Sequence, residues 1–360
     1  MIKYVLLFIF SVLWIVGCHP TLRHTAFEWG LAADSYRYGD LYHLANLPQF
    51  KKRVEICPKT YTNKHHSNNN ALYIIGDSFT EKERINADDF NSREFLRIHW
   101  NDSLTVHLDT TKRNVLLLET VERHFREHFA VSVRQFTVHS PQSTVHSPQP
   151  IADSRQPSAV SRPPIADNRP PIADNRPPIA VSQIAKTWTE ILKESEESLT
   201  YFLFYYDFFL FFKELKASLN LRWFDRHSDQ VAITPDGKNI LYRWDTDSIR
   251  ITSCFKYLSD KELNSLVVGV NKARDFYLAQ GFDAVYLSII PNKTSVVAPE
   301  MGNYNHLIER VQQHPQLKTP FIDVLAAYTQ HPQGVYSLSD THWNCTGQGI
   351  WLEAVNQRLR

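Results

Sequence analysis

The feature that most limits how this chain can fold is a series of short apolar runs, each followed by a turn or a polar stretch. The runs cover residues 71–75, 114–120, 284–290 and, more weakly, 321–327. Strands that helices cover on both faces have this unbroken apolar pattern, as in parallel sheets. Helical patterns lie between the runs, notably at 261–280 and 348–359. The alternation predicts an α/β fold: a doubly wound, mainly parallel sheet flanked by helices, with a site at the carboxyl ends of the strands.

A segment of different composition interrupts this pattern at 137–183. It repeats the sequence Pro-Pro-Ile-Ala-Asp-Asn-Arg, first at 163–169 and again at 170–176. The proline pair in each copy removes amide donors and blocks helix propagation, and the copies hold too few apolar residues to pack. We therefore predict a solvated, disordered insertion that divides one domain into two parts, 71–136 and 184–360.

The overall charge balance argues against two broad classes of protein. The chain has 39 Lys and Arg and 38 Asp and Glu, a formal net charge of +1, and 43% of its residues are hydrophobic. A nucleic-acid-binding protein would show a basic patch or stripe, which this balance gives no reason to expect. A wholly disordered chain would combine few apolar residues with a high net charge. We expect a globular protein with no nucleic-acid partner.

The N-terminus has the pattern of an export signal. Lys3 supplies a positive charge, residues 5–16 form an apolar run, and Gly17 then precedes Cys18. The run is too short to span a bilayer comfortably, and a small residue before a cysteine looks like a bacterial lipobox. We predict a lipoprotein signal peptide at 1–17 and a lipid on Cys18, which would anchor the exported protein to a membrane, facing the periplasm or the cell surface. The alternative is an uncleaved signal-anchor, and both place the body outside the cytoplasm.

Residues 18–70 are assigned to an N-terminal extension. Beyond Cys18 the chain has three more cysteines, Cys57, Cys254 and Cys345, and no pair has the close spacing of a zinc site. In an oxidising compartment one disulfide can form and one thiol is left over. We treat these cysteines as structural.

One motif competes for a metal. His124-Phe125-Arg126-Glu127-His128 matches the inverted zinc-peptidase pattern, in which two histidines share a helix face. Five-residue matches arise easily in a chain with 16 histidines, and no third ligand is evident from the spacing. We predict no metal and no other cofactor.

Residues 199–216 are exceptionally aromatic. The segment is shorter than a membrane span and contains Asp207. A buried helix is the first prediction, and a docking surface for a membrane partner is the alternative.

The candidate nucleophile is Ser78, in the motif Gly76-Asp77-Ser78 directly after the first apolar run. A serine on such a turn has an exposed hydroxyl beside backbone amides, which suits both a nucleophile and an oxyanion hole. Asp and Ser are also good helix caps, so the motif alone is weak. A nucleophilic serine needs a base, and the base needs a carboxylate to orient it. Asp340 and His342 have that chemistry, although a polar turn is the alternative for them, and we predict a triad of Ser78, His342 and Asp340.

Four short blocks together resemble the SGNH-like polysaccharide O-acetyltransferases of the alginate AlgX/AlgJ type. The blocks are GDSF (76–79), VER (121–123), PNK (291–293) and DTHW (340–343). The resemblance implies an SGNH-like fold and acetyl transfer through Ser78 to polysaccharide hydroxyls. It also implies a membrane protein that delivers the acetyl group. The further oxyanion or substrate-binding candidates are Asp77, Arg123, Lys293 and Trp343.

Two departures from that family leave the reaction open. In the alginate proteins the Asp-x-His block comes before the serine block, whereas here Ser78 comes first, as in ordinary SGNH esterases. Those esterases carry Asp-x-x-His, whereas the block here is Asp-x-His at 340–342, and this chain has no Gly-x-Asn-Asp block. Arg123 is the candidate replacement for the missing oxyanion Asn, with a structural ion pair as the alternative. The expected function is polysaccharide O-acetyl transfer, and the alternatives are a carbohydrate acetylesterase and a non-catalytic carbohydrate-binding lipoprotein.

Overall fold

The computed structural model describes residues 2–18, 37–59, 69–102, 105–130, 137–139, 207–331 and 334–360. The chain divides into two units: Met1–Asp34 with Thr144–Phe209, and Ser35–Ser143 with Leu210–Arg360. In the first unit the structure describes the helix α1 (Ile2–Cys18), which ends at the predicted lipid attachment residue. Within the described ranges, no helix combines the length and apolar character needed to cross a membrane. Signal cleavage and lipidation stay predictions.

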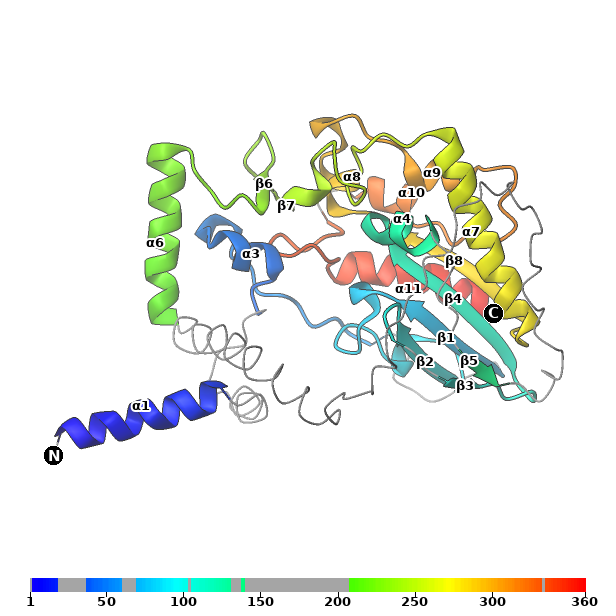
Figure 1. The fold of residues 1–360 in the computed structure, drawn as a ribbon, viewed down its shortest axis with the longest axis horizontal. Helices are drawn as coiled ribbons and strands as arrows, with labels where there is room; N and C mark the ends of the chain where they lie inside the picture. Colours follow the sequence, from blue (N-terminus) through cyan, green and yellow to red (C-terminus); the bar gives the residue numbers. More distant parts are fainter. Residues whose placement is uncertain are drawn as a thin grey trace, which may run out of the picture. The chain divides into compact units, whose positions relative to one another are not determined.

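The second unit is built on a four-stranded parallel sheet (Figure 1). In spatial order its strands are β2 (Glu94–His99), β1 (Asn70–Gly76), β4 (Arg113–Val121) and β8 (Ala284–Ile290). The three clear apolar runs of the sequence correspond to β1, β4 and β8, so the prediction of a mainly parallel α/β fold is confirmed. The strand β2 lacked such a run because it lies at the sheet edge, where most of its side chains are partly or fully exposed.

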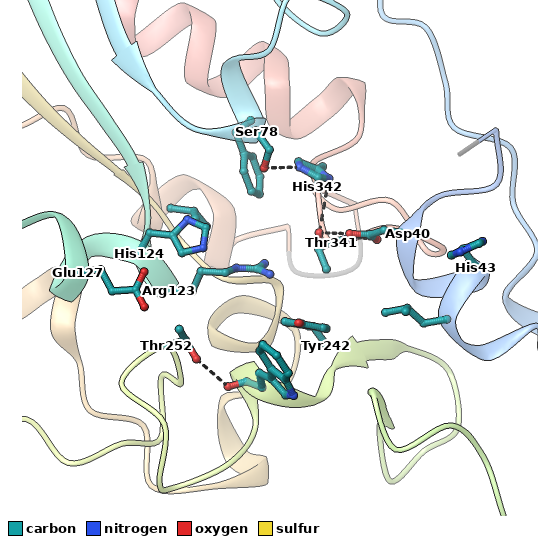
Figure 2. Close-up of a pocket in the computed structure, with 14 residues that line it drawn as sticks. Asp40, His43, Ser78, Arg123, His124, Glu127, Tyr242, Thr252, Thr341 and His342 are labelled. Atoms are coloured by element: carbon teal, nitrogen blue, oxygen red, sulfur yellow. Dashed lines mark hydrogen bonds between the residues drawn. The ribbon is translucent and has the colours of Figure 1, made fainter. Parts of the chain in front are cut away.

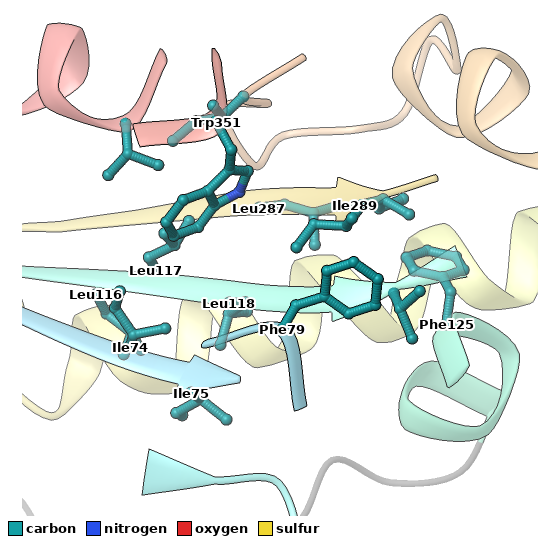
Figure 3. Close-up of a cluster of buried hydrophobic side chains, with 14 of the residues drawn as sticks. Ile74, Ile75, Phe79, Leu116, Leu117, Leu118, Phe125, Leu287, Ile289 and Trp351 are labelled. Carbon is teal, nitrogen blue, oxygen red and sulfur yellow. The ribbon is translucent and has the colours of Figure 1, made fainter. Parts of the chain in front are cut away.

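Helices cover both faces of this sheet, with α7 (Asp260–Ala279) on one side and α11 (Cys345–Leu359) on the other (Figure 1). Both lie close to the helical patterns expected at 261–280 and 348–359. Figure 3 shows the core between them, where Leu117 and Leu287 of neighbouring strands are almost fully buried. Trp351 of α11 packs onto the sheet and donates from Nε1 to Ser288 Oγ over 3.0 Å.

The strand order fixes where the site lies. From β1 the chain moves to β2 on one side, whereas β4 and β8 lie on the other side of β1. In open sheets of this kind, ligands bind beyond the carboxyl ends of the strands at which the order reverses. Here those strands are β1, which ends at Gly76, and β4, which ends at Val121.

Shorter elements complete the second unit. The helices are α3 (Asp40–Ala45), α4 (Glu122–Ala130), α6 (Asp207–Phe224), α8 (Lys293–Val297), α9 (Leu307–Gln312) and α10 (Leu325–Thr329). Of these, α6 belongs to this unit from Leu210 onward. The 3-10 helices are η1 (Pro48–Phe50), η2 (Ser78–Thr80), η3 (Ala87–Asp89), η4 (Arg243–Asp245) and η5 (Pro299–Met301). The small sheets are β3 (Thr105–His107) with β5 (Thr137–His139), and the hairpin of β6 (Val231–Ile233) and β7 (Ile240–Tyr242).

Two segments differ from their predictions. The weak run at 321–327 is not a strand, because only Phe321 bridges to Leu287 before the chain turns into α10. The first residues of the predicted insertion form β5, which pairs with β3, and residues 140–183 lie outside the described ranges.

The aromatic segment forms a helix from Asp207 onward, and its residues 199–206 lie outside the described ranges. Only part of this helix is buried as predicted. Leu210 is buried, whereas Phe211 and Phe212 are 59% and 51% exposed. The prediction of a buried helix is therefore wrong for this part, and the docking surface stays a prediction.

One disulfide closes a very long loop. Cys57 and Cys345 are bonded across 288 positions, and Cys254 is a buried free thiol. The bond joins the segment before the sheet to the first residue of α11.

Candidate active site

The site begins at the turn that follows β1. Asp77 caps the 3-10 helix η2, and its carboxylate accepts from Phe79 N over 3.0 Å and from Val121 N over 2.6 Å. The second bond joins the end of β1 to the end of β4. Ser78 is the first residue of η2, where a backbone amide has no acceptor within its own helix. The turn therefore holds both the Ser78 hydroxyl and the Ser78 amide in a fixed place.

A buried carboxyl group supports this turn from behind. Glu119 Oε2 accepts from Asp77 N over 3.0 Å and from Thr80 Oγ1 over 2.9 Å. Burial and the neighbouring Asp77 raise the pKa of Glu119 well above its ordinary value. A Cβ at Gly76 would lie 2.1 Å from Thr80 Oγ1 and 2.5 Å from Glu119 Oε2. Glycine is required at this position because the supporting groups leave no room for a side chain.

The predicted triad residues meet across the site. Ser78 and His342, far apart in sequence, face each other in Figure 2. Ser78 Oγ lies 2.8 Å from His342 Nε2, and His342 Nδ1 lies 2.5 Å from Asp340 Oδ1. Asp340 Oδ1 also accepts from the His342 backbone amide over 2.9 Å. With the imidazole proton on Nδ1, Nε2 is left to accept the Ser78 proton, which is the arrangement of a serine with its general base.

The charge on Asp340 is held by its neighbours. Burial would raise the pKa of this carboxyl, but His342 and its hydrogen bonds keep the pKa of Asp340 well below its ordinary value. Arg84, at 3.9 Å from Asp340 Oδ2, acts in the same direction. A carboxylate that stays ionised can stabilise an imidazolium as it forms.

Lys293 does not face the site as predicted. Its side chain is buried, and Nζ donates to the carbonyl oxygens of Ser337, Leu338 and Asp340 over 2.7, 2.9 and 3.2 Å. Burial lowers the pKa of Lys293 to about 7, while the nearby carboxylates of Asp40 and Asp340 act in the opposite direction. Three carbonyl acceptors match the three N–H groups of an ammonium. Lys293 therefore supports the loop that carries Asp340, and its assignment to substrate binding is wrong.

Asp77 is likewise a support and not a substrate contact. Its side chain is buried, and both carboxylate oxygens accept backbone hydrogen bonds. Burial would raise the pKa of Asp77, but His124 and the amides of Phe79 and Val121 lower it to about 2. Both oxygens of this carboxylate therefore hold the turn in place.

Trp343 is also in the interior. It is 4% exposed and packs between Phe79, at 5.0 Å between ring centroids, and Trp351, at 5.4 Å. Its assignment to substrate binding is wrong, because the ring is covered by other aromatic side chains. It contributes to the site only by packing under η2.

Arg123 faces the pocket beside the triad (Figure 2). Its Nη2 lies 3.3 Å from Asp245 Oδ2, and its guanidinium carbon lies 5.5 Å from the centroid of the Tyr242 ring. Burial raises the pKa of Asp245 to about 6 and Arg123 opposes this, so the pair is ionised above that pH. Arg123 Nε and Nη2 are buried and, within the part of the chain that the structure describes, have no hydrogen-bond acceptor. The structural ion pair weighed as the alternative is present, but its acid is Asp245, whereas Glu122 bonds to Asn292 and Ser295.

A pocket of about 480 Å³ opens over Ser78 and His342. Arg123 and His124 line one side of it, and Tyr242, Trp244 and Thr252 line another. Trp244 is 42% exposed, and its ring lies 5.5 Å from that of Tyr242. The pocket therefore combines an aromatic surface with polar and charged side chains.

The histidines of the competing zinc motif have separate environments. His124 lies 3.8 Å from Asp77 Oδ2, whereas His128 stacks on Trp100 at 4.2 Å and its Nδ1 lies 2.9 Å from Thr120 Oγ1. Among the described residues, they belong to no group with three metal-ligating side chains in reach of one another. In the described ranges the one such group is Asp40, Asp340 and His342, whose atoms hydrogen-bond to one another or to Thr341.

Sequence reasoning missed several residues of the site. Asp40 hydrogen-bonds to Thr341, and Arg97 Nη2 donates to the Asp77 carbonyl oxygen over 2.6 Å. Tyr242 and Trp244 enter the pocket from the hairpin of β6 and β7 and from η4. None of these residues stands in a block that was assigned to the site. The local signals were Gly39 before Asp40 and the Asp-x-x-His spacing of Asp40 and His43, and both patterns are too common to suggest a site.

No known protein-family model matches this chain, and neither a curated protein nor a solved structure matches it. The function proposed below therefore rests on the chemistry of the site.

Proposed function

We propose that this protein is a serine acyltransferase of the SGNH-like type, which transfers acetyl groups to hydroxyls of an extracytoplasmic polysaccharide through an acyl-Ser78 intermediate. The observation that carries the proposal is the series of hydrogen bonds from Ser78 Oγ through His342 to Asp340. Ser78 and His342 also line a pocket. Serine hydroxyls in such a series become nucleophiles at neutral pH. The position at the ends of β1 and β4 also agrees with where open parallel sheets bind ligands.

The reaction has two steps. In the first, His342 Nε2 takes the proton of Ser78 as Oγ bonds to the acetyl carbon of a donor, and His342 then protonates the departing group of the donor. In the second, an acceptor hydroxyl gives its proton to His342 Nε2 and bonds to the acetyl carbon, and Ser78 regains a proton as it leaves. Asp340 stabilises the imidazolium in both steps.

The oxyanion of each tetrahedral intermediate would be held by the Ser78 amide and by Arg123. The Ser78 amide has no intrahelical acceptor, and Arg123 lines the same pocket as Ser78 and His342. Preorganised donors of this kind contribute about 3–4 kcal/mol each to transition-state stabilisation. Arg123 thus replaces the asparagine that ordinary SGNH esterases use.

The lining of the pocket supports a carbohydrate acceptor. Sugars present C–H groups on their faces, which pack on aromatic rings, and hydroxyls on their edges, which need polar partners. Trp244 and Tyr242 supply the rings, while Thr252, His124 and Arg123 supply polar groups around the same space.

The cellular setting of the proposal is an exported protein on a membrane surface. The disulfide between Cys57 and Cys345 supports an oxidising compartment, where such bonds persist. A lipid on Cys18 would hold the enzyme there. Because cytosolic acetyl donors do not reach that compartment, a membrane protein would supply the acetyl group, and it is the proposed partner.

A chromogenic acetyl ester tests the catalytic part of the proposal. Wild type should release the chromophore and form an acetyl-Ser78 adduct that mass spectrometry detects after acid quenching. Ser78→Ala should do neither, and the exposed control Ser265→Ala should match wild type. Absence of both turnover and adduct in wild type would favour a non-catalytic carbohydrate-binding protein.

An acceptor distinguishes transfer from hydrolysis. With oligosaccharides and the same ester, a transferase should yield acetylated sugar at the expense of free acetate. An esterase should instead release acetate from a pre-acetylated glycan and give no acetylated product. The second outcome would replace the transferase proposal by the acetylesterase alternative.

A further inference from the structure

The segment before the sheet, residues 37–57, lies against the loop that carries the triad acid and base. We call this segment the strap. Tyr42 N donates to the Ser339 carbonyl oxygen over 3.0 Å, and Ser339 Oγ donates to the Lys52 carbonyl oxygen over 2.7 Å. The disulfide from Cys57 to Cys345 then ties the end of the strap to the start of α11. We call residues 337–342, which include Asp340 and His342, the catalytic loop. The strap is thus fixed to the catalytic loop at several points.

The closest approach is at Gly39. A Cβ at this position would lie 2.5 Å from the Ser339 carbonyl oxygen and 2.8 Å from Asp340 Cβ. Its φ of +80° also lies in the left-handed region that favours glycine. This contact places the next residue, Asp40, directly beside the triad.

Both carboxylate oxygens of Asp40 bind Thr341, the residue between the triad acid and base. Oδ1 accepts from Thr341 N over 2.8 Å, and Oδ2 accepts from Thr341 Oγ1 over 2.5 Å. Thr341 Oγ1 in turn lies 3.5 Å from His342 Nδ1. Figure 2 shows Thr341 between Asp40 and His342.

Asp40 is also a second carboxylate close to the imidazole. One polar atom from each of Asp40, Asp340 and His342 lies within 4.8 Å of the others. Burial and then Asp340 raise the pKa of Asp40, while His342 and Thr341 lower it. The two carboxylates share one cationic partner when the imidazole is protonated, so each stabilises that protonated form.

We propose that Asp40 is a positioning residue of the active site, which holds Thr341 so that Asp340 and His342 keep the geometry needed to activate Ser78. The role in catalysis rests on the proposed function. It makes the strap, which lies outside the sheet and its helices, part of the catalytic machinery. The disulfide at Cys57 keeps the strap in place.

The rate at which an alkyl fluorophosphonate labels Ser78 tests this role. In this reaction Ser78 Oγ bonds to phosphorus, fluoride leaves, and His342 accepts the serine proton. Asp40→Asn keeps the size of the side chain and one acceptor oxygen, so the fold should persist with an unchanged melting temperature. The labelling rate should fall about 10- to 100-fold, because a small displacement of a catalytic group has an effect of that size. The exposed Asp88→Asn is the matched control.

A pH profile separates positioning from a merely structural role. The titratable and charged groups around His342 are Asp340 and Asp40, with Arg84 beside Asp340 and Lys293 beneath it. Four more line the pocket: His43, Arg123, His124 and Glu127. Because Asp40→Asn removes one carboxylate from this set, the acid limb of the labelling profile should move about 1 pH unit lower. Asp88→Asn should leave the limb in place.

The outcomes are distinct. If wild type is labelled and Asp40→Asn matches its rate and pH profile, Asp40 has no positioning role and the proposed function stands. If wild type is not labelled at Ser78, the proposed function fails and the role of Asp40 fails with it. If Asp40→Asn does not fold, Thr341→Val removes one of the two bonds to Asp40 and should slow labelling. A folded Thr341→Val with the wild-type rate would then overturn the inference.

Discussion

Lys293 lies beneath the loop that carries the triad acid, with its Nζ 3.2 Å from the carbonyl oxygen of Asp340. The same ammonium binds the carbonyl oxygens of Ser337 and Leu338. On its other side this loop contacts Asp40 through Thr341. The acid and base are thus held between two charged side chains that belong to distant parts of the sequence. This arrangement makes the loop, and not the serine turn alone, a determinant of activity.

The first prediction concerns Lys293→Met, which keeps the length of the side chain and leaves the three carbonyl groups without their donor. The free energy of unfolding should fall by about 2 kcal/mol, since buried acceptors lose charged hydrogen bonds while the cost of burying a charge is removed. Fluorophosphonate labelling should slow about 10-fold or more. Denaturant titration and labelling kinetics measure the two effects, with the exposed Lys261→Met as control. A variant with unchanged labelling would show that the loop holds its geometry without Lys293.

The second prediction is a pH dependence of stability that arises from Glu122. Its Oε2 accepts from Asn292 N and Ser295 Oγ, and burial raises its pKa to about 7. A carboxyl whose folded-state pKa is raised stabilises the fold below its ordinary pKa and loses that contribution as pH rises. Because of this group, the free energy of unfolding of wild type should therefore fall by about 2–3 kcal/mol as the pH rises from 5 to 8.

The test is Glu122→Gln, which cannot ionise. As the pH rises from 5 to 8, the free energy of unfolding of wild type should fall relative to that of Glu122→Gln by about 2–3 kcal/mol. Urea titrations across this range measure the difference. Glu353→Gln, on the exposed side of α11, should leave the pH dependence unchanged. Parallel curves for Glu122→Gln and wild type would contradict the assignment.

The third prediction contrasts two tryptophans. Trp343 is buried under η2, whereas Trp244 is partly exposed in the pocket. Trp343→Ala should lower the free energy of unfolding by about 3–5 kcal/mol, the usual effect of removing a buried aromatic side chain. Trp244→Ala should change stability little and raise the KM for an oligosaccharide acceptor about 10-fold. Equal acceptor KM values for Trp244→Ala and wild type would contradict the proposed carbohydrate subsite.

The fourth prediction concerns the disulfide between Cys57 and Cys345. Its loss in Cys57→Ser should lower the free energy of unfolding by about 2–4 kcal/mol, since the bond restricts the unfolded chain. It should also slow Ser78 labelling, because the strap loses one of its attachments. Cys254→Ser keeps the disulfide and is the control. Reduction of the disulfide by dithiothreitol should slow the labelling of both wild type and Cys254→Ser. A Cys57→Ser variant that labels at the wild-type rate would show that the other contacts hold the strap alone.

The part of the fold that could be read from the sequence is the part with local signals. Buried strands β1, β4 and β8 are continuous apolar runs, and α7 and α11 have helical periodicity. The edge strand β2 could not be found this way, since its side chains are mostly exposed and it is held by backbone pairing to β1. Chain periodicity reports burial, and an edge strand has little of it.

The residues of the proposed triad stand in short motifs with recognisable chemistry, so the sequence alone singled out Ser78, Asp340 and His342. It could not determine the direction in which a side chain points. Lys293 and Trp343 stand in equally suggestive motifs, and both turn inward, one to bind carbonyl groups and the other to pack among aromatic rings. Asp40 stands in none of the four blocks. Only the tertiary structure brings it to Thr341, because the strap is held against the catalytic loop by contacts and a disulfide between positions nearly 300 residues apart.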